Sequence, residues 1–142
     1  LMPAGATRNL GSYFVDFILK YRGWAFYTDF MGRTCDKPLF DEDPAAYVYT
    51  GSGLNIQTSW LIKRKWEIAL RNSTLFPSDN IRPKAGYNTY NQTTVGLTRY
   101  IIGHSLKVQA DLSYDSYGQR NSQIIPDNYN RWQLRFQVEL GL

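Results

Sequence analysis

The stretch RWQLRFQVELGL, residues 131–142, decides the fold of this chain. Apolar residues occupy every second position in it, and polar residues or glycine fill the positions between. Such a period of two fits a β-strand and not a helix. The apolar positions are Trp132, Leu134, Phe136, Val138, Leu140 and Leu142. This segment is therefore predicted to be a strand with one apolar face and one polar face.

The same alternation recurs in six segments upstream, so about seven strands are predicted. They lie near residues 13–22, 24–31, 54–62, 66–71, 92–101 and 106–114. Tight turns are expected near Arg22, 63–65 and Gly103, whereas the links at 36–47, 77–91 and 118–130 are long and rich in Gly, Pro, Asn and Asp. Short turns at one rim and long loops at the other are typical of outer-membrane β-barrels, in which the short turns are periplasmic.

Aromatic residues make up 15% of the chain, and several lie on the apolar parity beside a predicted tight turn. These membrane-interface candidates are Tyr21, Trp24, Trp60 and Trp66. Trp132 lies at the opposite strand ends, together with Tyr13, Phe30 and Tyr114. Two belts at two depths indicate two membrane interfaces. A soluble β-barrel with an apolar interior would scatter these residues without regard to depth.

We therefore predict an all-β fold, an antiparallel transmembrane β-barrel of which residues 1–142 form the C-terminal portion, in the bacterial outer membrane. Its outward face would contact the lipid bilayer and lipopolysaccharide. Single-chain bacterial barrels have even strand counts, so further strands are expected in the same precursor or in another chain. Leu1 is not an initiator Met, which also predicts a longer precursor. The charged inward residues favour a wide barrel, since open channels need about 16 strands.

The inward parity collects the charged residues that we predict to line a pore. The cations are Lys20, Arg33, Arg71, Lys107, Arg131 and Arg135, and the acids are Asp16, Asp29, Glu67, Asp111 and Glu139. With Arg22 at a turn the balance is mildly positive, and rings of Arg and Lys favour anions in a pore. The alternative is that these residues are ordinary cross-strand pairs. That alternative is weaker for Arg131 and Arg135, because no acid separates them on their face.

Three stretches resemble a known family: WEIALRNSTLFPSDN at 66–80, TTVGLTRYIIGHSLKVQADLSYD at 93–115 and RWQLRFQVELGL at 131–142. They are similar to the C-terminal end of the phosphate-selective porin O and P family, as found in Bacteroidetes-type genomes. The resemblance covers roughly residues 49 to 142. It implies a homotrimeric porin of about 16 strands that passes small anions such as phosphate. No phosphate-binding residue of the family maps onto this segment.

Other chemistries find little support in the sequence. His104 and Ser105 are adjacent, so on a strand they point to opposite faces and do not form a catalytic pair. The acidic loop 35–44 follows no known calcium-loop spacing. Basic residues alternate with acids and form no patch for nucleic acid. We predict no catalytic residue, metal or cofactor.

Two stretches, Asn72-Ser73-Thr74 and Asn91-Gln92-Thr93, match the glycosylation pattern formally, and we interpret the match as chance in a bacterial outer membrane. Three functions are open: a passive porin for small anionic solutes, a weakly conducting barrel that acts as a structural or interaction partner, and a soluble ligand-binding barrel. The formal net charge of +4 is consistent with an anionic solute.

Overall fold

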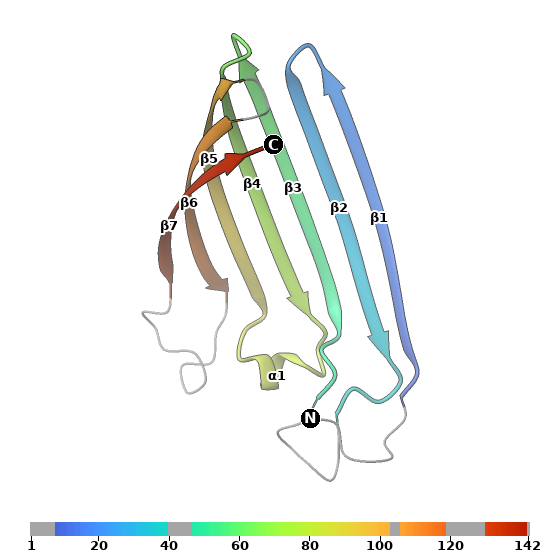
Figure 1. Ribbon diagram of the computed structural model, residues 1–142. Helices are drawn as coiled ribbons and strands as arrows, with labels where there is room; N and C mark the ends of the chain where they lie inside the picture. The colour runs from blue at the N-terminus through green and yellow to red at the C-terminus, as the bar shows by residue number, and fades with distance from the viewer. Residues whose placement is uncertain (1–7, 40–46, 103–105, 119–129, 142) are drawn as a thin grey trace.

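A computed structural model describes residues 8–39, 47–102, 106–118 and 130–141, which form one antiparallel sheet in sequence order (Figure 1). The strands are β1 (Leu10–Tyr21), β2 (Trp24–Cys35), β3 (Gly51–Ile62), β4 (Trp66–Pro77), β5 (Thr89–Ile102), β6 (Leu106–Gly118) and β7 (Arg131–Leu140). The predicted all-β fold with seven strands is confirmed. β1 and β7 are the two edges, so the described sheet is open rather than closed.

The connections sort by length as the sequence predicts. The turns after β1 and β3 lie at one end of the sheet, and the link between β4 and β5 lies at the other, where β2 and β6 also end (Figure 1). One long link contains a short helix that the sequence did not predict, α1 (Arg82–Ala85), which follows the fully buried Ile81 and ends at Gly86 in the left-handed region. No helix in the described part of the chain is long and apolar enough to cross a membrane.

Because the strands pair in register, residues of the same parity form rows that cross all seven strands. One row runs through Leu19, Phe26, Thr58, Leu70, Val95, Leu112 and Leu134. A row on the other face runs through Asp16, Asp29, Asn55, Ser73, Gln92, Asp115 and Arg131. The first row is apolar except for one threonine, and the second is entirely polar.

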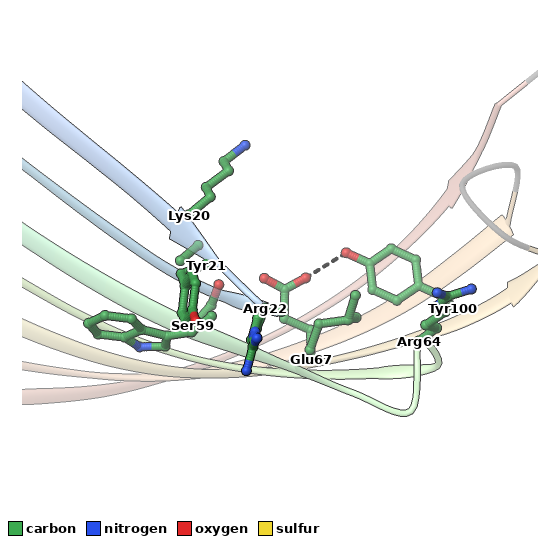
Figure 2. Close-up of a pocket in the computed structure, with 11 residues that line it drawn as sticks. Lys20, Tyr21, Arg22, Ser59, Arg64, Glu67 and Tyr100 are labelled. Atoms are coloured by element: carbon green, nitrogen blue, oxygen red, sulfur yellow. Dashed lines mark hydrogen bonds between the residues drawn. The ribbon is translucent and has the colours of Figure 1, made fainter.

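Burial in this sheet is inverted relative to a soluble protein. Ile81 is the one buried hydrophobic residue that the described part of the chain contains, whereas Thr94, Asp111 and Asp115 are buried on the sheet. The apolar face is bare, with Phe136 72% exposed. The sheet curves, and the labelled Lys20, Glu67 and Tyr100 project from its concave side (Figure 2). This is opposite to the arrangement that a soluble barrel with an apolar interior requires.

The bare apolar face has the shape of a slanted band. On β1 it runs from Tyr13 to Tyr21, and on β7 from Trp132 to Leu140. The lower end of the band is Tyr13 on β1 and Trp132 on β7. Following the strand pairing from Trp132 back to β1 leads to Phe17, which is four residues closer to the short turns than Tyr13. Strands that tilt through a layer of constant thickness produce this shift.

Candidate functional site on the concave face

Three ion pairs form a ladder between β6 and β7 on the concave face. Lys107 Nζ lies 2.9 Å from Glu139 Oε2, Arg131 Nη2 lies 3.1 Å from Asp115 Oδ2, and Arg135 Nη2 lies 2.6 Å from Asp111 Oδ2. The sequence predicts that Arg131 and Arg135 are the least neutralised cations. This prediction is wrong, because an acid lies directly opposite each of them on β6.

Asp111 is the best-satisfied group of the ladder. Its carboxylate accepts hydrogen bonds from Arg135 Nε at 3.0 Å and from Gln109 Nε2 at 2.9 Å. The carboxylate also lies close over Gly96 of the neighbouring strand, where a Cβ atom would stand 2.8 Å from Oδ1. Glycine at position 96 therefore leaves the space that this buried carboxylate occupies.

The acids of the ladder lie beneath the arginines. The side chains of Asp115 and Asp111 are 3% and 5% exposed, whereas those of Arg131 and Arg135 are 68% and 56% exposed. The surface that β6 and β7 expose on the concave face is therefore formed by guanidinium groups rather than by carboxylates.

Arg71 is the central cation of the concave face. Its register partners are Gln57 and Thr94, both uncharged. It is half-buried and lines a polar hollow of about 120 Å³ together with Asp111 and Arg135. No residue that the structure describes forms an ion pair or hydrogen bond with Arg71. Two arginines and one aspartate leave this hollow with a formal charge of +1.

β1 and β2 carry a different set of inward residues. Asp16 lies directly opposite Asp29, and Asp29 Oδ2 accepts a hydrogen bond from Asn55 Nδ2 at 2.8 Å. The neighbouring inward pair is apolar and consists of Phe14 and Met31. This part of the wall has no ion pair among the described residues.

Two further predicted cations belong to β1 and β2. Arg33 donates from Nε to Ser12 Oγ at 3.3 Å, near the long links. Lys20 lies at the other end, in a hollow of about 630 Å³ beside the short turns (Figure 2). In this hollow Tyr100 Oη donates a 2.6 Å hydrogen bond to Glu67 Oε2. Figure 2 shows that Lys20 and this hydrogen-bonded pair project from the same side of the sheet.

The predicted aromatic residues all lie on the opposite, apolar face. Trp24 lies opposite both Tyr21 and Trp60, and Trp66 lies opposite Ile62, close to the short turns. Toward the long links, the rings of Tyr114 and Trp132 are 4.7 Å apart. The structure therefore places each belt at one end of the strands.

Comparisons with known protein families, with curated proteins and with solved structures find no match to this chain.

Asp115 is absent from the inward set that the sequence predicts, because the predicted strand ends at residue 114. Asp115 has the same parity as Asp111, so a longer predicted strand would have placed it on the inward face. With Asp115 included, the inward set holds six acids against the six predicted strand cations and the turn residue Arg22. The mildly positive balance expected from the sequence is therefore smaller by one charge, and the exposure of the arginines matters more than the count.

A polar cluster on the apolar face was also not foreseen from the sequence. Its members are Asn72, Thr74, Asn91 and Thr93 on β4 and β5. Both amide nitrogens donate two hydrogen bonds within the cluster, and both hydroxyls donate one, at distances from 2.8 to 3.3 Å. Every side-chain donor hydrogen is thus used inside the cluster. The cluster thus consists of the Asn and Thr residues of the two formal glycosylation motifs.

Several residues considered in the sequence analysis lie outside the described ranges, among them His104, Ser105, Leu142 and positions 40–46 of the acidic loop. Within the described ranges, no group of three or more His, Cys, Asp or Glu side chains is arranged to hold a metal ion.

Proposed function

We propose that this chain forms part of the wall of an outer-membrane porin, a passive diffusion channel for small anionic, phosphate-like solutes. The observation that carries the proposal is the inverted sheet, with a bare apolar convex face and a charged concave face. Each Å² of apolar surface left in water costs about 25 cal/mol, and a lipid layer removes that cost. The concave face would then line the aqueous lumen.

The shape of the apolar face supports a membrane position. Its slanted band is what tilted strands require if the hydrocarbon layer has constant thickness. Aromatic residues cluster at the two ends of the strands, where membrane interfaces would lie. The loops also sort by length between the two ends, as in outer-membrane barrels.

The preference for anions rests on the exposed arginines. Arg131 and Arg135 cover their buried partner acids, and Arg71 forms no ion pair with a described acid although it shares a hollow with Asp111. Cations that line a pore raise the local concentration of anions in it. This effect needs no covalent step and no metal.

Closure of the barrel would require further strands. β1 and β7 run in the same direction, because six antiparallel steps separate them. An antiparallel barrel therefore needs an odd number of added strands, and a barrel of about 16 would need about nine. The homotrimer that the family resemblance implies remains part of this proposal.

The test is a planar-bilayer recording of the full-length precursor, with conductance and reversal potential measured across a salt gradient. We expect an open pore that favours anions, and a smaller anion preference in Arg71→Gln, which removes a charge without breaking an ion pair. Lys37→Gln, in the link after β2, is the matched control and should leave the reversal potential unchanged. A folded barrel with no conductance would contradict the proposal.

A specific observation favours a second function, a weakly conducting barrel that holds a structural partner. Phe14, Ile18 and Met31 lie on the concave face and are 68%, 59% and 43% exposed. Apolar side chains in a wet lumen are costly unless something covers them. Under this alternative Phe14→Ser would lower partner retention in pull-downs, whereas in an open pore it would change only conductance.

A further inference from the structure

The two short turns use unusual residues. Within the described part of the chain, the non-glycine residues with positive φ are Arg22 (46°), Lys63 (49°) and Arg64 (56°), and all three belong to these turns. Hairpin turns with this backbone favour Asn, Asp and Gly, because other side chains are strained there. Three basic residues at three strained positions indicate that their charge serves a purpose other than forming the turn.

These residues belong to a larger basic surface, which we call the short-turn rim. Its cations are Lys20, Arg22, Lys63, Arg64, Lys65 and Arg99. All six are exposed, and none forms an ion pair with a residue that the structure describes. Glu67 is the acid that lines the adjoining hollow, and it accepts a hydrogen bond from Tyr100 rather than pairing with a cation of the rim. Six cations close to one acid give this end of the sheet a net positive charge.

Two of these cations lie against the aromatic belt. The guanidinium carbon of Arg22 is 5.2 Å from the centre of the Tyr21 ring, and that of Arg99 is 5.1 Å from the centre of the Trp66 ring. Both rings are on the apolar convex face. The cations of the rim thus reach the depth at which interfacial aromatic residues lie, and not only the end of the lumen.

The turns are held firmly to the sheet. Gly23 O accepts a hydrogen bond from Leu61 N at 2.7 Å, and Lys65 O accepts one from Tyr100 N at 2.8 Å. The backbone of each turn is therefore tied to a neighbouring strand, which fixes the positions from which the basic side chains extend.

We propose that the short-turn rim binds the phosphate groups of anionic phospholipids in the leaflet that the short turns face. This inference rests on the proposed membrane position and names a ligand for it. Arginine and lysine beside interfacial aromatics fit phosphodiesters, which carry negative charge at that same depth. A soluble acidic partner would need the cations to point away from the membrane, and Arg22 and Arg99 instead lie over belt aromatics.

The experiment reconstitutes the full-length protein in vesicles of phosphatidylcholine with either brominated phosphatidylglycerol or brominated phosphatidylcholine, and measures quenching of tryptophan fluorescence. Trp24, Trp60 and Trp66 lie near the rim and report lipid contact there. The test variant combines Arg22→Asn, Lys63→Asn and Arg64→Gly, which supply residues that these turns favour, so folding should be retained. Lys37→Asn, at the other end of the sheet, is the matched control.

We expect wild type and Lys37→Asn to prefer phosphatidylglycerol, and the triple variant to lose about fivefold or more of that preference. Added salt should weaken the wild-type preference, because exposed charges are screened. Equal quenching by both lipids in wild type, or an unchanged preference in the triple variant, would overturn the inference while leaving the membrane position intact.

Two other outcomes separate this inference from its alternatives. No quenching by either lipid would refute the membrane position itself. Displacement of phosphatidylglycerol by soluble polyglutamate at equal charge concentration would overturn the lipid assignment and identify the rim as a surface for acidic proteins.

Discussion

β6 and β7 lie at one edge of the sheet and β1 and β2 at the other, and their concave faces are stabilised in opposite ways. Between β6 and β7 each inward cation faces an acid, whereas Asp16 faces Asp29 between β1 and β2. On β1 and β2 the aromatic contacts are on the convex face, with the Phe17 and Phe26 rings 6.4 Å apart. The pairing of β6 with β7 is therefore supported by ion pairs on the concave face as well as by apolar contacts on the convex face, whereas the pairing of β1 with β2 combines convex contacts with a repulsive pair of acids.

The largest expected effect breaks the ladder. Arg135→Met should destabilise the protein by about 3 kcal/mol, because it leaves the Asp111 carboxylate buried without its counter-charge. Chemical unfolding of the full-length protein in detergent micelles measures the loss. The double variant with Asp111→Asn should recover much of the stability, since it removes the orphaned charge as well. Equal destabilisation by the single and double variants would mean that the pair contributes no coupling.

A smaller effect is expected on the aromatic side of the comparison. Phe17→Leu keeps an apolar side chain but removes the ring contact with Phe26, which is worth about 0.5–1.5 kcal/mol. The same unfolding measurement applies, with Val15→Leu on the same face of β1 as the control. A loss no larger than that of the control would show that the ring contact does not stabilise β1 against β2.

The smallest effect is expected to have the opposite sign. Asp16→Asn should stabilise the protein by about 0.5 kcal/mol, because it removes one of two like charges on neighbouring strands. Removal of a concave-face charge would thus stabilise the pairing of β1 with β2, in Asp16→Asn, and destabilise the pairing of β6 with β7, in Arg135→Met. The gain should shrink at high salt, since Asp16 is exposed. Destabilisation by Asp16→Asn would show that repulsion between the two aspartates does not weaken the pairing of β1 with β2.

The faces of the strands were predictable from sequence, because a period of two fixes the face of every residue once one is known. The partner of each residue was not predictable, because it depends on the register between strands. This is why the sequence predicts weak neutralisation of Arg131 and Arg135, although Asp115 and Asp111 lie opposite them. The helix α1 has four residues, too few for any periodicity to show.

The polar cluster on β4 and β5 marks the other limit of sequence reasoning. Asn72 and Thr74 share the parity of Leu70 but are polar. The alternation of hydropathy therefore ends at Leu70, although the strand continues. The strand stays paired with β5 to Leu75 and with β3 to Pro77, since backbone pairing does not depend on these side chains being apolar.

The closed hydrogen bonding of this cluster constrains how its sequence can change. Loss of Asn72 alone would remove the acceptor of one Asn91 amide hydrogen and of the Thr74 hydroxyl, and it would leave these polar groups unmatched, at about 1–3 kcal/mol for each buried group. Replacement of all four residues by apolar ones of similar size leaves nothing unmatched. The four positions should therefore be inherited as a unit, conserved together or lost together, and single-residue variants at any of them should be rarer than the quadruple replacement.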